Sequence, residues 1–168
     1  MKLILNTILT CGLLATQAGA AEVTAEINDR EGNNLGAVLV TDSASGIAVA
    51  TLTLLDLPAG VHGIHFHETG DCSASDCASA GGHLAGDREH GVQTADGPHP
   101  GDMPNLTVTQ DGTGEVEVFL PFLDVERDMM DDDGAAFVMH SGLDDYESQP
   151  AGNAGDRIAC GVFKVRSE

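Results

Sequence analysis

The sequence predicts an all-β domain, either an antiparallel sandwich or a Greek-key barrel. Short runs rich in Val, Ile, Leu and Thr recur along the chain, and Gly, Asp and Asn separate them. Several runs alternate apolar and polar residues, which is typical of a strand with one buried face. Few segments have helical periodicity, and strands without crossover helices favour an antiparallel arrangement.

Eight segments have this strand character. They are residues 22–28, 35–41, 47–55, 61–67, 105–110, 114–120, 135–140 and 159–166. Asp111-Gly112 and Gly134 indicate tight turns between neighbouring strands. No internal repeat and no linker divides the chain, so we expect one domain.

Two long segments, residues 68–104 and 141–158, do not fit the strand pattern. Both are rich in Gly and show no regular periodicity. Compact domains seldom carry loops of this length unless the loops are functional. The first segment holds three of the seven histidines, and we therefore expect the functional site there.

The first 20 residues have the composition of a secretory signal peptide. Lys2 is followed by an apolar run over residues 3–15, and Ala18-Gly19-Ala20 forms a small-x-small cleavage site. We expect cleavage after Ala20. The chain then divides into a signal peptide, residues 1–20, and an exported domain, residues 21–168.

Export changes what the cysteines predict. Cys11 lies in the signal segment, where it would mark a lipoprotein only with a smaller residue than Thr10 before it. The remaining Cys72, Cys77 and Cys160 are an odd number in an oxidising compartment. We expect one disulfide and one free thiol.

The charge balance excludes two classes of partner. The chain has 7 basic and 27 acidic residues, a net charge of −20, and loss of Lys2 with the signal leaves 6 basic residues and −21. Phosphate groups would be repelled, so we expect neither nucleic acid nor an anionic membrane surface as a partner. No stretch after the signal segment is apolar enough for a membrane span, so we expect no membrane association after cleavage.

His65 and His67 lie two residues apart in an expected strand. Successive side chains of a strand alternate between its faces, so both imidazoles leave the same face and can chelate one metal ion. Taken alone, the pair could equally be two incidental polar residues on a solvated strand. It does not stand alone, because the following loop and a later strand supply further ligands.

These further ligands fall into a recognisable chemical pattern. His83, His90, His99 and Asp102 supply three imidazoles and one carboxylate, a tetrahedral set suited to zinc. His140 lies at the end of a later expected strand, and imidazole-rich sites suit copper as well as zinc. The sequence therefore predicts two adjacent metal sites.

Four segments resemble the motifs of the copper/zinc superoxide dismutase family. Residues 63–72 (GIHFHETGDC) are similar to its copper-ligand signature, and residues 79–83 (SAGGH) are similar to the segment of its bridging histidine. Residues 99–106 (HPGDMPNL) resemble the end of its zinc loop, and residues 152–161 (GNAGDRIACG) resemble its second signature. The resemblance covers essentially the whole chain after residue 20 and is closest to bacterial periplasmic members.

The resemblance implies a fold, an activity and a location. The fold is an eight-stranded antiparallel Greek-key β-barrel, an immunoglobulin-like sandwich, with two long functional loops. The activity is dismutation of superoxide to dioxygen and hydrogen peroxide in the periplasm. The cofactors are one copper ion, which cycles between redox states, and one structural zinc ion per chain.

The resemblance also implies the ligands of each ion. Copper is held by His65, His67, His83 and His140. Zinc is held by His83, His90, His99 and Asp102. His83 therefore bridges the two ions and takes part in catalysis. The spacing from His83 to His90 is slightly shorter than is usual in the family.

Two residues outside the ligand sets have implied roles. Asp144 would accept hydrogen bonds from the outer nitrogens of His65 and His90, although taken alone it is a solvated loop carboxylate. Arg157 would be catalytic by attracting superoxide beside copper, because a guanidinium is permanently charged and presents fixed donors. Taken alone, Arg157 is a surface residue paired with Asp156.

For the disulfide, the resemblance implies Cys72–Cys160, with Cys77 as the alternative partner of Cys160. Cys72 matches the position used by bacterial relatives, whereas the spacing from Cys77 to His83 resembles that in eukaryotic relatives. Either bridge would tie the long loop to the last strand.

Other function classes remain open on the residues alone. A periplasmic module for copper storage or delivery would favour soft Met and Cys ligands, yet the Met residues here form no regular array. A purely structural Greek-key adhesion domain would leave the histidines unexplained. The sequence leaves both a monomer and a homodimer open.

Overall fold

The structure is a computed structural model that describes residues 20–166. The predicted signal peptide, apart from Ala20, lies outside the described residues. In chain order the strands are β1 (Glu22–Asp29), β2 (Asn34–Asp42), β3 (Ala48–Leu54), β4 (Gly60–His62), β5 (Ile64–His67), β6 (Leu106–Val108), β7 (Gly114–Leu120), β8 (Ala136–His140), β9 (Arg157–Val162) and β10 (Lys164–Val165). A 3-10 turn, η1 (Ala78–Ala80), and a short helix, α1 (Val125–Met129), lie between strands.

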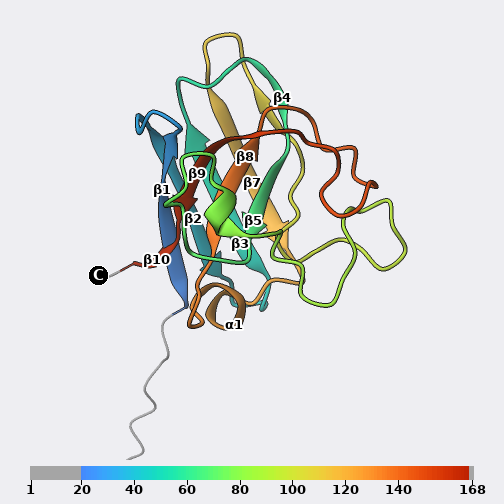
Figure 1. The fold of residues 1–168 in the computed structure, drawn as a ribbon. Coiled ribbons are helices and arrows are strands. Elements are labelled where there is room, and N and C mark those ends of the chain that lie inside the picture. The colour runs from blue at the N-terminus through green and yellow to red at the C-terminus, as the bar shows by residue number, and fades with distance from the viewer. Residues whose placement is uncertain (1–19, 167–168) are drawn as a thin grey trace, which may run out of the picture.

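The strands form one antiparallel sheet that curls into a nearly closed barrel (Figure 1). The order is β4-β6-β7-β3-β2-β1-β9-β8-β5, and β10 pairs with β1. The first and last strands of this order, β4 and β5, are separated in the chain by Gly63 alone. The chain therefore passes from one edge of the sheet to the other at this residue, and the predicted all-β antiparallel fold is confirmed.

Gly63 explains why the predicted strand 61–67 is two strands. Its N–H donates to the carbonyl of Gly142 at 2.8 Å, and its carbonyl accepts from the N–H of His140 at 2.9 Å. A Cβ at this position would lie 2.9 Å from Cβ of Ala154, closer than real Cβ contacts allow. Because no side chain is present, the strand can bend here, so that β4 pairs with β6 while β5 pairs with β8.

The core lies inside the barrel and contains the largest buried side chains, among them Ile27, Leu52, Ile64, Phe66 and Phe137. β5 and β8 are buried along their whole length, unlike the alternating β3. Their core-facing residues belong to the main hydrophobic cluster. Their other face lies under the two long segments, which connect β5 to β6 and β8 to β9. The predicted long loops are thus present, and they cover one wall of the barrel.

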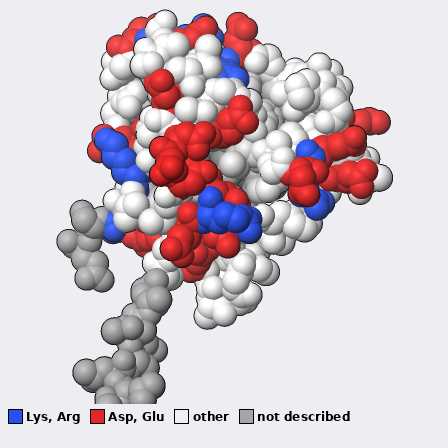
Figure 2. Space-filling view, turned by 60° about the horizontal axis from the view of Figure 1, so that its bottom comes forward, with Lys and Arg blue, Asp and Glu red and all other residues white. Residues whose placement is uncertain are grey.

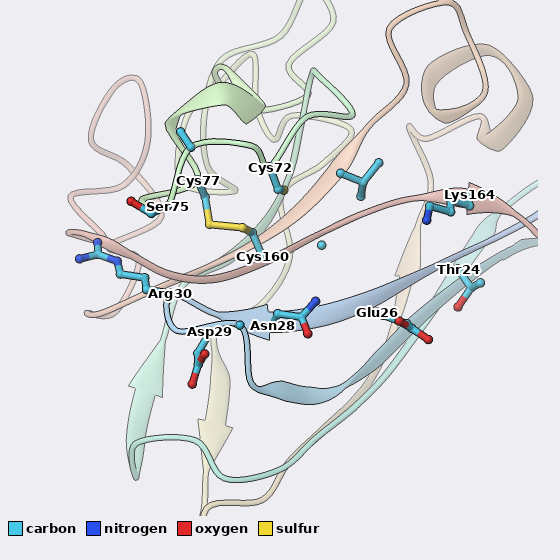
Figure 3. Close-up of a pocket in the computed structure, with 14 residues that line it drawn as sticks. Thr24, Glu26, Asn28, Asp29, Arg30, Cys72, Ser75, Cys77, Cys160 and Lys164 are labelled. Carbon is cyan, nitrogen blue, oxygen red and sulfur yellow. A yellow bond between two sulfur atoms is a disulfide. The ribbon is translucent and has the colours of Figure 1, made fainter.

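The predicted pairing of Cys72 with Cys160 is wrong, because the structure joins Cys77 to Cys160 (Figure 3). Their Cα atoms lie 6.3 Å apart, within the range that a disulfide spans. The carbonyl of Cys77 accepts a hydrogen bond from Nη1 of Arg157 at 2.6 Å, which holds this part of the loop over β9. Cys72 lies earlier in the same loop, partly buried, with a free thiol. The expected count of one disulfide and one free thiol is confirmed.

Two smaller features were not predicted. The helix α1 follows Asp124, whose carboxylate caps it by accepting from the N–H of Arg127 at 2.9 Å. The last predicted strand begins two residues earlier than expected, at Arg157, and a break at Phe163 divides it. Within residues 20–166, no helix has the length and apolar composition needed to cross a membrane.

Candidate metal centre

The predicted ligands lie together on the outer face of β5 and β8, beneath the two long loops. β5 supplies His65 and His67, and the end of β8 supplies His140. Isolated bridges pair His67 with His83 and His65 with Asp102, which bring the loop against the strand. All six histidines are at most 6% exposed. The structure thus brings every predicted ligand into one buried region.

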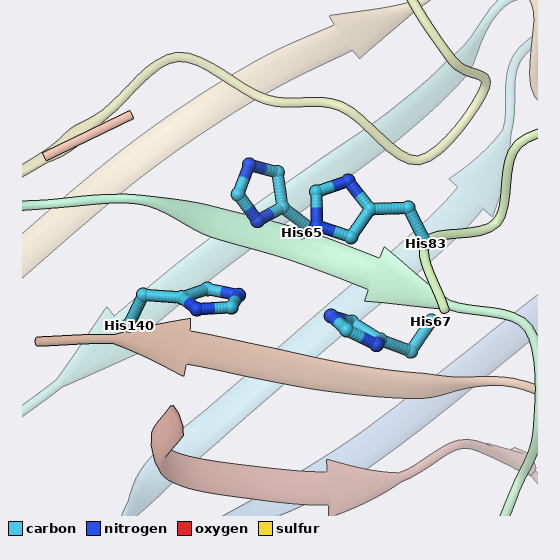
Figure 4. Close-up of side chains that lie close together, drawn as sticks. All are labelled: His65, His67, His83 and His140. Atoms are coloured by element: carbon cyan, nitrogen blue, oxygen red, sulfur yellow. The ribbon is translucent and has the colours of Figure 1, made fainter. Parts of the chain in front are cut away.

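Four imidazoles form the first ligand group, which we call the strand group: His65, His67, His83 and His140. Their rings converge on a shared space (Figure 4), and one nitrogen from each lies within 4.8 Å of the others. Among residues 20–166, each ring also has one buried nitrogen without a hydrogen-bond partner: Nδ1 of His65 and Nε2 of the other three. Buried polar atoms in folded proteins are nearly always partnered, so four such atoms facing one another need an explanation.

The hydrogen bond made by the second nitrogen of each ring determines which of the two nitrogens carries the proton. Nδ1 of His67 lies 3.1 Å from the carbonyl of Gly81, and Nδ1 of His140 lies 3.1 Å from that of Gly155. Nε2 of His65 lies 2.7 Å from the carboxylate of Asp144. A nitrogen that faces an oxygen acceptor carries the proton, so the opposite nitrogen keeps its lone pair. The unpartnered nitrogens therefore keep lone pairs that could bind a metal ion.

The strand group is electrically neutral at neutral pH. Burial lowers the pKa of His65 to about 3, of His67 to about 2 and of His140 to about 4. Burial also lowers the pKa of His83, although its hydrogen bond to the carboxylate of Asp102 acts in the opposite direction. Protons therefore do not compete for these lone pairs at neutral pH. An imidazole cage of this kind fits copper or zinc.

The second group, which we call the loop group, converges on one carboxylate oxygen. Oδ1 of Asp102 lies 3.2 Å from Nδ1 of His83, 3.1 Å from Nδ1 of His90 and 3.2 Å from Nδ1 of His99. Zinc in a tetrahedral site holds N and O ligands at 2.0–2.2 Å, which places neighbouring ligand atoms about 3.3 Å apart. The three distances from Oδ1 agree with this spacing, and three imidazoles with one carboxylate are donors that suit zinc, although the ligand atoms that all lie within 4.8 Å of one another belong to His65, His83, His90 and Asp102. His83 belongs to both groups through its two nitrogens.

Asp144 lies between the two groups and is 1% exposed. Its carboxylate oxygens lie 2.7 Å from Nε2 of His65 and 3.0 Å from Nε2 of His90. Asn105 holds its backbone, accepting from the N–H of Asp144 at 2.8 Å and donating to its carbonyl at 2.9 Å. Gly152 passes directly over this carboxylate, where any Cβ would collide with Oδ1. Sequence spacing gave no signal for Asn105.

The carboxylates make the loop group electrically different from the strand group. Burial alone would lower the pKa of His90, but hydrogen bonds to Asp102 and Asp144 outweigh it and raise the pKa to about 9. Burial would raise the pKa of both carboxyl groups, and their hydrogen bonds to histidines instead hold those pKa values well below the usual range. Each group of ligands therefore has its own charge state.

Arg157 lies at the start of β9, beside the strand group. Nη1 and Nη2 donate to the carbonyls of Cys77 and Gly81, each at 2.6 Å. Within residues 20–166, no carboxylate, Asp156 included, is within ion-pair distance of its guanidinium. The carbonyl of Gly81 also accepts from Nδ1 of His67, so one carbonyl links Arg157 to the strand group. Its positive charge is among the causes that lower the pKa values of His67 and His140.

Comparison with known proteins gives consistent matches. The family model described as copper/zinc superoxide dismutase (SODC) matches residues 35–163. The chain is 38% identical to "Superoxide dismutase [Cu-Zn]" of Caulobacter vibrioides, a match that covers 84% of each chain. It is 37% identical to "Superoxide dismutase [Cu-Zn] 1" of Aquifex aeolicus, over 92% of this chain and 95% of that protein.

Solved structures agree with the sequence matches. A crystal structure of a SOD-like protein from Bacillus subtilis superposes with a TM-score of 0.78 at 34% sequence identity. That match covers 83% of this chain and 96% of the other.

Proposed function

Because this chain belongs to the copper/zinc superoxide dismutase family, we propose that it dismutates superoxide to dioxygen and hydrogen peroxide with one copper ion and one zinc ion per chain. Family membership is not the whole argument, because one relative is named only as a SOD-like protein. The observation that carries the proposal is the set of four unpartnered, buried imidazole nitrogens beside a second, carboxylate-containing set.

The strand group is assigned to copper and the loop group to zinc. Copper is held by His65, His67, His83 and His140. Zinc is held by His83, His90, His99 and Asp102. The all-imidazole group has no net charge, which suits an ion that must change its oxidation state, whereas the group with a carboxylate suits a permanent divalent ion. Bound copper supplies the one-electron redox chemistry, taking an electron from one superoxide and passing it to a second.

The protein's own contribution is to hold ligands and move a proton. Nε2 of His83 is the only nitrogen of that ring that faces the strand group, because Nδ1 lies against Asp102. This Nε2 would carry a proton only in the half of the reaction in which it does not bind the ion. It would take that proton from solvent and give it to the second superoxide, and the other proton needed for hydrogen peroxide would come from water. Asp144 keeps His65 and His90 in fixed orientations, because it accepts a hydrogen bond from each.

Arg157 supplies the charge that binds superoxide. Two of its N–H groups are used by loop carbonyls, which fix the guanidinium beside the strand group. No carboxylate neutralises it at ion-pair distance within residues 20–166, so its charge is available to an anion. The chain as a whole is strongly acidic, with 27 Asp and Glu against 7 Lys and Arg, and the face seen in Figure 2 carries clusters of Asp and Glu with fewer Lys and Arg.

The test is an assay of superoxide removal by the domain of residues 21–168, loaded with copper and zinc. We expect catalysis in the doubly loaded protein and its loss in His67→Ala, which removes one strand-group ligand. Gln110→Leu is a matched control, because Gln110 is exposed in the turn after β6, away from the metal centre. Stoichiometric copper binding without turnover would favour copper storage and contradict the proposal.

We also propose that residues 1–20 direct export to the periplasm and are removed. The disulfide between Cys77 and Cys160 supports this location, because such bonds persist in oxidising compartments. N-terminal sequencing of the protein from a periplasmic fraction should begin at Ala21. All the assigned ligands come from one chain, so the proposed activity does not depend on a homodimer.

A further inference from the structure

Gln149 joins the second long loop to the backbone of His90. Oε1 of Gln149 accepts from the N–H of His90 at 2.9 Å, and Nε2 donates to the carbonyl of His90 at 2.9 Å. Both ends of one side-chain amide therefore bind both main-chain groups of one residue, although the two residues are 59 positions apart. Nε2 also donates to the carbonyl of Glu147 at 3.1 Å, which keeps the amide in its orientation.

The two hydrogen bonds between Gln149 and His90 differ in importance for the backbone of His90. His90 is completely buried, and within residues 20–166 its N–H has no acceptor other than Oε1 of Gln149. Its carbonyl has a second donor, the hydroxyl of Thr94 at 2.8 Å. A buried N–H without an acceptor is costly, so the acceptor half of the amide is the part that His90 cannot replace.

The contact acts on a ligand whose position is not fixed by a strand. His90 lies in the loop between His83 and Asp102, and its ring contacts carboxylates at both nitrogens. Those contacts orient the ring. Asp102 also holds the peptide unit after His90, since its Oδ2 accepts from the N–H of Gly91 at 2.9 Å, but it does not hold the peptide unit before His90. Gln149 fixes the backbone from the opposite loop, which also carries Asp144.

We propose that Gln149 is a positioning residue for zinc: it clamps the backbone of His90 so that Nδ1 stays in the loop group. This inference rests on the proposed assignment of the loop group to zinc. Within residues 20–166, the side chain of Gln149 hydrogen-bonds only to the backbones of His90 and Glu147 and to no ligand side chain, so its effect should be confined to zinc. The side chain is exposed, so its replacement removes no core packing.

The experiment measures zinc and copper affinity separately in the domain of residues 21–168, by competition with metal chelators. Gln149→Met keeps the length of the side chain and removes its two hydrogen bonds to His90 together with the one to Glu147. Gln149→Leu is a second apolar variant in case the first does not fold. Removing such supporting contacts typically weakens metal binding about 10- to 100-fold. We expect zinc affinity to fall in this range, with copper affinity within about 3-fold of the parent.

Two further variants separate positioning from general loop stability. Gln149→Glu restores an acceptor for the N–H of His90 without the donor, so its zinc affinity should lie between those of the parent and Gln149→Met. Gln93→Leu is the matched control: Gln93 is exposed in the same loop as His90, and its contact with the other loop is through its backbone N–H, which Leu retains. Gln93→Leu should bind zinc like the parent.

The outcomes are distinguishable. Parent-like zinc affinity in Gln149→Met and Gln149→Leu, an equal loss in Gln93→Leu, or an equal loss of copper would each overturn the clamp while leaving the zinc assignment intact. Failure of the parent itself to bind zinc would overturn the assignment of the loop group, and the clamp with it.

Discussion

The two ligand groups share His83 but are built in different ways. In the strand group, three of the four ligands project from β5 and β8, and each ring has a nitrogen with no partner in the part of the chain that the structure describes. In the loop group the ligands come from one long loop, and their donor atoms already converge on Asp102. The strand group is positioned by the sheet and is neutral, whereas the loop group is held in place by the carboxylates of Asp102 and Asp144.

This difference indicates how each site keeps its shape. The backbone hydrogen bonds between paired strands fix the direction of the side chains on a strand. The strand group therefore needs only one further hydrogen bond per ring, to set the tautomer. A loop has no ladder, and here its ligands depend on buried carboxylates and on contacts with the second long loop, through Asp144 and Gln149. We therefore expect changes in strand-group ligands to affect catalysis and changes in the loops to affect stability and zinc.

The largest effect should come from His83→Ala, because His83 alone belongs to both groups. We expect copper and zinc to be disturbed together and superoxide removal to fall by at least about 100-fold, the usual scale for loss of a proton-transfer group. His99→Ala is the comparison, since it should lose chiefly zinc and retain copper. Metal content per chain and activity are measured for both variants. Equal losses confined to a single metal in the two variants would argue against a bridging role.

The sequence predicts the strand group better than the loop contacts, for a physical reason. His65 and His67 share a face because strand geometry repeats every two residues, which spacing alone reveals. The disulfide was mispredicted because Cys72 and Cys77 lie in one irregular loop, where spacing does not determine which thiol faces β9. The role of Gln149 likewise cannot be predicted from the sequence, because only the fold brings its side chain to the backbone of His90.

The disulfide is the next contact to remove, because it ties the first long loop to β9. It closes a separation of 83 residues, and in the chain-entropy model a loop of this size contributes about 4–5 kcal/mol to stability. Cys77→Ser should therefore lower the free energy of unfolding by a few kcal/mol, measured in denaturant without metals. Cys72→Ser should leave it nearly unchanged. A large loss in Cys72→Ser with little loss in Cys77→Ser would mean that the other pairing exists in solution.

Acid should destabilise the metal-free protein through the strand group. Burial lowers the pKa values of His65, His67 and His140 to about 3, 2 and 4, whereas in the unfolded chain they lie near 6.5. As the pH falls below 6.5 the unfolded state binds protons that the folded state does not, so stability falls. Each histidine contributes at most about 1.4 kcal/mol per pH unit.

Denaturant titrations of the metal-free protein between pH 6.5 and pH 5 test this effect. His90 does not offset the loss, because its raised pKa means that it is protonated in the folded state throughout this range. Constant stability over the range would show that the strand-group rings take up protons while the protein stays folded, and that they are less deeply buried in solution than in the structure.

The smallest effect concerns the field that superoxide meets at Arg157. With a net charge near −21 after loss of the signal segment, the domain should repel superoxide at long range. Close to the strand group the guanidinium and the metal ions are positive, and at 0.15 M salt the Debye length of about 8 Å screens distant carboxylates. Arg157→Ala should slow catalysis about 10-fold without loss of copper, because the carbonyl of Gly81 still accepts from His67 when Arg157 is absent.

Activity of the parent should be nearly independent of salt or rise with it, because screening removes net repulsion. The measurement is kcat/KM against ionic strength for both proteins. A steep fall with salt in the parent would require attractive steering by basic groups, which this acidic surface does not provide.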